Sequence, residues 1–269
     1  MNFMKKFTSV FSGIKPVIGM VHLKALPGTP KNTLNSSEII NAALLEADIY
    51  KRAGINAIML ENMHDVPYLN GSVGHEISTL MTLIGHLIKQ RTNVHVGIQI
   101  LAGANMEALA AAKAAGLDFI RVEGFVFAHV ADEGIIEAQA AKLLRYRKKI
   151  GAEDVAIFTD IKKKHSSHAI TEDVSLLDTA KAAQFFLSDG VIVTGSHTGI
   201  SASIEELKTL KDMAIPVLIG SGITKDNIAD YWSLCNGIII GSHFKKEGYW
   251  ENELDYNRVS AFMKLVRSF

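Results

Sequence analysis

The stretch PVLIGSGITKDNIADYWSLCNGIIIGSHF (216–244) contains two short apolar runs, and each run ends in a Gly-Ser pair. Near-continuous hydrophobicity over about four to eight residues is typical of a β-strand covered on both faces, as in a parallel sheet. Further runs of the same kind precede these two. They are PVIGMVHL (16–23), AIMLEN (57–62), HVGIQI (95–100), FIRVEG (119–124), VAIFTDI (155–161) and VIVTG (191–195). The sequence therefore predicts eight buried parallel strands, the last two at 216–222 and 237–244.

Segments with helical character separate these runs. Gly54, Gly116 and Gly151 follow three of them, where a left-handed residue can end a helix before the next strand. The predicted helices span 37–53, 106–115, 135–149, 176–187 and 203–213. Strands that alternate with helices over 269 residues favour a closed (β/α)8 TIM barrel. The alternative is a doubly wound open sheet, but that fold normally has a glycine-rich turn after its first strand.

The chain shows no linker, repeat or charge block that would separate a second domain. We expect residues 16–269 to form a single barrel domain and residues 1–15 to form a short lead-in packed on it. The lead-in contains three lysines and no acidic residue. A mitochondrial presequence is therefore an alternative to our expectation of a cytoplasmic protein.

Composition excludes several classes of function. The 28 Lys and Arg residues balance the 28 Asp and Glu residues, so the chain lacks the excess positive charge that nucleic-acid binding needs. Cys235 is the single cysteine and cannot form an internal disulfide. No apolar run approaches the roughly 20 residues that cross a bilayer. We expect a soluble protein with a small-molecule ligand, and the composition is compatible with a homo-oligomer.

The active site of a TIM barrel lies at the C-terminal ends of its strands, and polar residues collect there in this sequence. Burial and mutual repulsion can separate the pKa values of carboxylates that converge on one pocket. The candidate catalytic residues are Asp160, Glu61, Lys162 and His22. Lys162 lies two residues after Asp160 and could share a substrate atom with it, or form a Schiff base if desolvated. The candidate substrate-binding residues are Asn62, Gln99, Arg121, Glu123, His165 and His168.

Arg121 and Glu123 share one face of their predicted strand, and the sequence leaves open whether that face points into the barrel. Arg121 or Lys162 could instead neutralise the carboxylates in structural ion pairs.

Glycines follow the last three predicted strands, where many barrels bind phosphate through backbone N–H groups. Glycine lets the backbone approach a phosphate closely. The candidate phosphate-binding residues are Gly195, Gly220, Ser221, Gly222, Gly241 and Ser242. The alternative is that these glycines only turn the chain at the rim of the barrel.

Histidines are numerous enough that a divalent metal must be considered as a cofactor. His165 and His168 lie three residues apart, and His22, His197 and His243 end other strands. Histidine and carboxylate are ligands of Zn²⁺, but no compact motif such as H-E-x-x-H is present. We therefore assign no metal ligands and expect these histidines to bind hydroxyls or phosphate, or to transfer protons.

Long motifs resemble the BtpA/SgcQ family over about residues 16–265. They are PVIGMVHLKALPG, ENMHDVPY, AAKAAGLDFIRVEG, DEGIIEAQAAKLLRYRKKIGAEDVAIFTDIKKKHSSH, IVTGSHTG and PVLIGSGITKDNI. EGFVFAHVADEG (123–134) and TDIKKKHSSHAIT (159–171) resemble its eukaryotic branch. The resemblance implies a TIM barrel related to the ribulose-phosphate-binding group. One member is named for photosystem I biogenesis, and others are described as TIM-barrel enzymes or nucleosidases.

The resemblance extends to the candidate sites. It implies a phosphate site at Gly220, Ser221, Gly222, Gly241 and Ser242, and more weakly acid–base roles for Asp160 and Lys162. Bacterial relatives often follow the third strand with an Asn-x-Leu-Arg-Asn pattern, whereas this chain has Gln99-Ile-Leu-Ala-Gly. The two branches therefore need not share a substrate.

Together these features predict an enzyme that acts on a phosphorylated sugar or a nucleoside-type ribosyl compound. The reaction would be acid–base chemistry of a lyase, isomerase or nucleosidase type. The alternative is a non-catalytic binding or assembly factor for a membrane complex, built on the same barrel.

Overall fold

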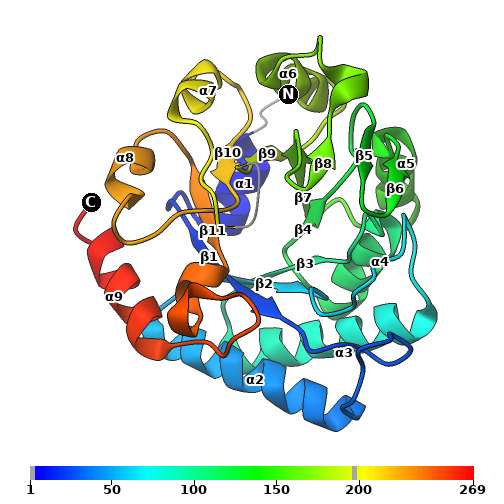
Figure 1. Ribbon diagram of the computed structural model, residues 1–269, viewed down its shortest axis with the longest axis vertical. Coiled ribbons are helices and arrows are strands. Elements are labelled where there is room, and N and C mark those ends of the chain that lie inside the picture. The colour runs from blue at the N-terminus through cyan, green and yellow to red at the C-terminus, as the bar shows by residue number, and fades with distance from the viewer. Residues whose placement is uncertain (1–3, 196–198) are drawn as a thin grey trace.

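The computed structural model describes residues 4–195 and 199–269, which form the predicted closed barrel of parallel strands (Figure 1). The barrel strands are β1 (Val17–His22), β2 (Ala57–Glu61), β3 (His95–Gln99), β4 (Phe119–Val122), β7 (Ala156–Ile161), β9 (Gly190–Val193), β10 (Val217–Ile219) and β11 (Gly237–Ile240). Their order around the ring is β1-β11-β10-β9-β7-β4-β3-β2. Pairing of β11 with β1, with Ile18 opposite Ile239, closes the ring.

Helices surround this ring in the described chain. They are α2 (Ser36–Ala53), α3 (His75–Thr92), α4 (Asn105–Ala115), α5 (Ala140–Lys149), α6 (Leu176–Phe185), α7 (Ile204–Thr209), α8 (Ile228–Trp232) and α9 (Tyr256–Val266). Asn35 and Glu38 form a capping box at the start of α2. Gly54 and Gly116 end α2 and α4 in the expected left-handed conformation. None of the described helices is long and apolar enough to cross a membrane.

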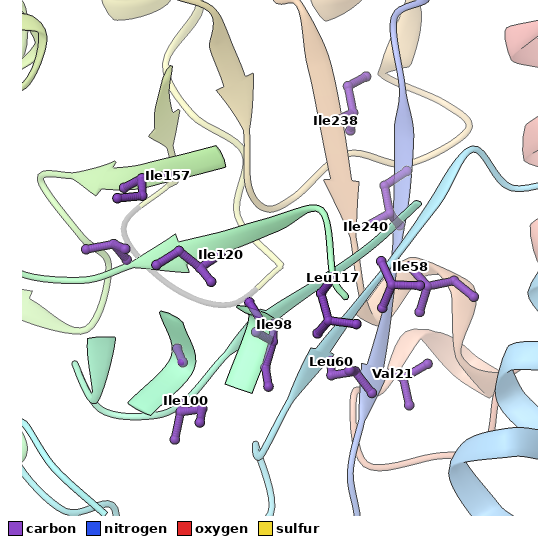
Figure 2. Close-up of a cluster of buried hydrophobic side chains, with 14 of the residues drawn as sticks. Val21, Ile58, Leu60, Ile98, Ile100, Leu117, Ile120, Ile157, Ile238 and Ile240 are labelled. Carbon is purple, nitrogen blue, oxygen red and sulfur yellow. The ribbon is translucent and has the colours of Figure 1, made fainter. Parts of the chain in front are cut away.

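Alternation along each strand separates two apolar layers. Outward side chains pack under the helices, and Figure 2 shows Ile98, Ile120 and Ile157 on three successive strands of this layer. Inward side chains fill the N-terminal half of the barrel. These are Ile18, Met20, Ala57, Met59, Phe119, Ala156, Phe158, Ile192, Leu218 and Ile239. Nearer the C-terminal ends, the same faces carry polar residues.

The predicted helix 135–149 is wrong in its first turn. Residues 134–136 instead form β6 (Gly134–Ile136), which pairs with β5 (His129–Ala131) in an antiparallel hairpin, and β8 (Ser166–Ser167) adds a third strand. Gly134 has a φ of +101°, which allows the tight turn after Glu133. Ile135 is exposed and Ile136 buried, which is the alternation of a strand rather than a helix.

A short helix closes the N-terminal end of the barrel. Helix α1 (Met4–Phe11) lies within the ring of strands in Figure 1. The rings of Phe7 and Phe11 are buried, and Phe11 lies 5.8 Å from Phe119 between ring centroids. Phe7 lies 6.0 Å from Phe158. Part of the segment expected as a lead-in therefore belongs to the inner core.

We expect Phe11→Ala to lower the free energy of unfolding by about 3–5 kcal/mol, because it leaves a cavity where the inner core meets α1. Urea denaturation measures this change. Phe185→Ala is the control, because Phe185 is 80% exposed. Its effect should stay within about 0.5 kcal/mol. Equal unfolding midpoints for the two variants would show that α1 does not seal the barrel.

Candidate functional site

A cavity of about 460 Å³ opens at the C-terminal end of the barrel. Met20 and Ile239 contribute apolar surface to it from the inner core, and both apolar residues, such as Leu101 and Trp250, and polar side chains from several strand ends complete the lining. Arg121 and Glu123 both line it, which settles the orientation that the sequence left open. The size and position fit a small-molecule site of a TIM barrel.

His22 and Glu61 form a pair at the ends of neighbouring strands, where they are in register. His22 Nε2 lies 3.6 Å from Glu61 Oε2, and both residues are buried and line the cavity. His22 Nδ1 lies 3.2 Å from the carbonyl oxygen of Trp250. Because a carbonyl only accepts, Nδ1 carries the proton and Nε2 presents a lone pair towards Glu61.

The two members of this pair have shifted pKa values. Burial, together with the Lys245 cation, lowers the pKa of His22 to about 3, so its imidazole is neutral at physiological pH. Burial raises the pKa of Glu61, although Arg121 and Lys164 act in the opposite direction. A neutral imidazole next to a carboxyl that holds its proton more tightly than usual can accept and donate protons at one place.

Asp160 is held by Arg121 rather than presented to the cavity. Arg121 Nε and Nη2 donate to Asp160 Oδ2 and Oδ1 at 2.8 and 2.9 Å. The Asp160 side chain is completely buried and lies outside the cavity lining, whereas Arg121 lines the cavity. This is the structural ion pair considered from the sequence. The ion pair holds the Arg121 guanidinium in place at the wall of the cavity.

Glu123 is held from two sides. Gln99 Nε2 donates to Glu123 Oε1 at 2.9 Å, and Lys163 Nζ donates to Glu123 Oε2 at 3.0 Å. All three side chains line the cavity. Lys163 was not among the site residues predicted from the sequence. Lys164 also lines the cavity, and burial together with Arg121 lowers its pKa.

Two predicted site residues after β7 lie away from the large cavity. Lys162 has a φ of +48°, and its ammonium donates to the Thr171 carbonyl at 3.0 Å. His168 Nε2 lies 2.9 Å from the Lys163 carbonyl. Both line a second, much smaller cavity beside His129. His165, by contrast, lines the large cavity.

Asn62 also lies outside the lining of the large cavity. Its Nδ2 donates to Asp65 at 2.9 Å, and its Oδ1 accepts from the Leu101 N–H at 2.8 Å. Asp65 in turn accepts from the Leu26 N–H at 2.8 Å. Asn62 therefore ties together the loops that follow β1, β2 and β3, and supports the rim of the site from behind.

Of the six residues predicted to bind phosphate, all but Gly195 line the large cavity. The Gly195 N–H donates to Ser221 Oγ at 3.1 Å, and Ser221 Oγ donates to the Ile200 carbonyl at 2.9 Å. A Cβ at Gly195 or Gly222 would collide with the backbone of residues 200–201. Close packing therefore accounts for these two glycines without a ligand.

Gly241 connects the glycine loops to the acid–base pair. A Cβ at this position would lie 3.1 Å from both His22 Cε1 and His22 Nε2. The absence of a side chain lets the imidazole lie against the loop after β11. A ligand group bound at Gly241 would therefore be adjacent to the lone pair of His22.

Arg258, which was not among the predicted site residues, brings a cation to the glycine-loop side of the cavity. Arg258 Nε donates to the His243 carbonyl at 2.6 Å. His243 Nε2 accepts from the Lys225 N–H at 3.2 Å, and burial with the Arg258 cation lowers the pKa of His243 to about 4. Arg258 lies on α9, far from any strand end in sequence, so no local motif marked it.

A metal centre was the alternative use of the histidines. Within residues 4–195 and 199–269, no group of three or more His, Cys, Asp or Glu residues is arranged to hold a metal ion. His197, one of the histidines considered, lies outside the described residues.

Solved structures with the same fold share little sequence with this chain. Orotidine 5'-phosphate decarboxylase from Pyrococcus horikoshii gives a TM-score of 0.57 at 15% identity, covering 93% of this chain and 99% of that one. Phosphoribosyl anthranilate isomerase from Thermus thermophilus gives 0.55 at 12% identity, covering 94% and 98%. These likenesses establish the TIM-barrel fold alone.

Sequence relatives are closer. A mitochondrial protein of Caenorhabditis elegans is 52% identical over 258 residues, covering 94% of this chain and 93% of that one. A protein of Methanocaldococcus jannaschii is 36% identical over 253 residues, covering 94% and 95%. The photosystem I biogenesis protein BtpA of Synechocystis is 35% identical over 260 residues, covering 95% and 89%. The BtpA family model matches residues 13–268. This confirms the resemblance found in the motifs: the chain belongs to the BtpA family.

Proposed function

We propose that the chain is an enzyme that moves protons on a small phosphorylated sugar or ribosyl compound bound in the barrel cavity. The observation that carries this proposal is the His22–Glu61 pair, buried at one wall of the cavity and in contact with the glycine loop at Gly241. Shifted pKa values are common among groups at functional sites, and burial shifts the pKa values of both members of this pair.

The anionic group of the substrate binds on the side of β10 and β11. Gly220, Ser221 and Gly222 line the cavity after β10, and Gly241 and Ser242 line it after β11. Arg258 adds a fixed positive charge on the same side. Backbone N–H groups and a guanidinium together are a common arrangement for phosphate recognition.

The reacting carbon of the substrate lies near His22 and Glu61. His22 Nε2 takes a proton from the carbon or from an attacking water, and Glu61 supplies a proton to the oxygen that gains charge. Arg121, held in place by Asp160, and Lys164 place positive charge beside the same space. Such fixed charges stabilise negative charge as it develops in the transition state. Asp160 is thus a positioning residue in this proposal.

We expect Glu61→Gln to lower turnover by about 10²–10⁴-fold, because an amide cannot supply the proton. A panel of sugar phosphates and nucleosides is followed by mass spectrometry, and the compound that reacts is used for kinetics. Glu172→Gln is the matched control, since Glu172 is exposed and away from the cavity. Full turnover by Glu61→Gln would contradict the assignment.

The pH profile of the wild-type enzyme distinguishes the roles of the pair. Glu61 acts as an acid, so the rate should fall as pH rises through its raised pKa, above the ordinary value of 4.5. His22 stays neutral above about pH 3, so no inflection should appear near 6.5. A rate that rises with pH through this range would reverse the assigned role of Glu61.

We expect a phosphorylated sugar to stabilise the protein against heat, because only the folded state binds it. Ligand at 100 times its Kd adds about 2.7 kcal/mol. For a domain of this size that corresponds to roughly 5–10 °C in a thermal-shift experiment. Ser242→Asp should abolish the shift by repelling the phosphate, whereas Ser37→Asp on the exposed start of α2 should preserve it. An equal rise in melting temperature with ligand in both variants would show that the phosphate does not bind at Ser242.

The second candidate function is a non-catalytic assembly factor, and one surface feature favours it. Phe185, Phe186 and Leu187 are exposed together at the C-terminal end of α6, at 80, 43 and 42%. Adjacent exposed apolar side chains can mark a protein interface, including one between copies of the chain. One relative is named for photosystem I biogenesis. An assembly factor would tolerate Glu61→Gln and fail when Phe185 and Phe186 are replaced by Ser.

Two locations in the cell are candidates for this protein. We propose the cytoplasm, as expected from the sequence, with the mitochondrion as the alternative that the name of the Caenorhabditis elegans relative favours.

A further inference from the structure

Gln99 presents a buried hydrogen-bond acceptor that has no partner among the residues that the structure describes. The residue ends β3, is 2% exposed and lines the large cavity. Its amide nitrogen donates to Glu123 Oε1 at 2.9 Å, while its carbonyl oxygen, Oε1, makes no hydrogen bond. Burying an acceptor without a donor costs free energy, so such a group calls for an explanation.

The neighbours of Gln99 determine which atom of its side-chain amide faces Glu123. Glu123 Oε2 accepts from Lys163 Nζ at 3.0 Å, and this ammonium favours the ionised carboxylate, although burial raises the pKa of Glu123. A carboxylate only accepts hydrogen bonds, so the nitrogen of Gln99 must face it. The carbonyl oxygen of Gln99 is therefore the atom that remains available to accept a hydrogen bond, and Gln99 lines the cavity.

Further acceptors lie on the same side of the cavity. Glu133, in the turn between β5 and β6, lines the cavity, and its buried Oε2 has no hydrogen-bond partner in the described part of the chain. The Tyr68 hydroxyl, also at the cavity, is already committed as a donor to the Met63 carbonyl at 2.7 Å. The side of the cavity formed by Gln99 and Glu133 therefore offers hydrogen-bond acceptors, whereas the anion site that we propose lies on the side of Arg258.

The charged groups nearest Gln99 are already paired. Lys163 pairs with Glu123, and Arg121 pairs with Asp160. Lys164 adds a further cation to the cavity lining, and Asp132 and Glu133 add carboxylates. A hydroxyl group supplies a proton to the Gln99 carbonyl without adding charge.

We propose that Gln99 is a specificity-determining residue whose carbonyl accepts a hydrogen bond from a hydroxyl group of the ligand, so that the site selects a polyhydroxylated sugar phosphate. This inference rests on the proposed function, because it assumes that the anionic group binds on the opposite side. The inference adds that the end of the ligand away from its anionic group carries a hydroxyl group.

Isothermal titration with ribose 5-phosphate and with inorganic phosphate tests this role. Gln99→Met keeps the length of the side chain and removes the acceptor. It should weaken ribose 5-phosphate binding about three- to tenfold, the range for one neutral hydrogen bond, and leave phosphate binding unchanged. Gln99→Asn, which withdraws the carbonyl by one methylene, should behave in the same way. Gln90→Met, at an exposed position of α3, is the matched control.

Each outcome separates this inference from the proposed function. Binding of ribose 5-phosphate to Gln99→Met within twofold of wild type would overturn the role of Gln99 and leave the phosphate site standing. Loss of phosphate binding in both Gln99 variants would show that the residue acts through the fold, which also overturns its role. A wild-type protein that binds neither compound would overturn both proposals. Unchanged phosphate binding also shows that a variant is folded.

Discussion

The buried ion pair between Arg121 and Asp160 is the interaction on which the polar half of the barrel depends. Alternation along the strands directs ionisable side chains from neighbouring strands towards the same interior, where an uncompensated charge is costly. The bidentate pair neutralises two of them at 2.8 and 2.9 Å. Lys163 does the same for Glu123 at 3.0 Å. Glu61 has no comparably short cation contact in the described chain, and its partner at 3.6 Å is a neutral imidazole. Burial raises the pKa of Glu61 against the opposing effect of Arg121 and Lys164, and Glu61 is the carboxyl that we propose for proton transfer.

Sequence patterns predicted the barrel well because strands buried on both faces have a strong signature. The runs at 16–23 and 237–244 contain little but apolar and glycine residues until their last positions, and both became barrel strands. The hairpin of β5 and β6 was missed because Ile135 and Ile136 fit the apolar stripe of a helix as well as the alternation of a strand. Only the turn at Gly134 decides between them, and its positive φ is a property of the fold.

The site was predictable only as far as strand ends reveal it. His22, Glu61, Gln99 and Arg121 line the cavity because each ends a strand or lies on its last inward position. Loop residues follow no such rule. Lys162 has a φ of +48° and lies away from the large cavity, whereas Lys163 and Lys164 line it. Three consecutive lysines in a sequence do not indicate which of them reaches a cavity. Arg258 reaches the cavity from α9, so its role depends on how the last helix packs on the barrel.

The two ends of the cavity place different demands on the chain. On the side of β10 and β11, glycines are required by close packing as much as by any ligand, so they are a weak indicator of phosphate when read alone. On the side of β3, the Gln99 carbonyl and the Glu133 carboxylate lack donors that the described protein could have supplied. Packing explains a glycine, but it does not explain a buried acceptor left without a hydrogen bond. Our proposal for the ligand therefore rests more on the unsatisfied acceptors near β3 than on the glycine loops, even though the glycines are the more recognisable motif.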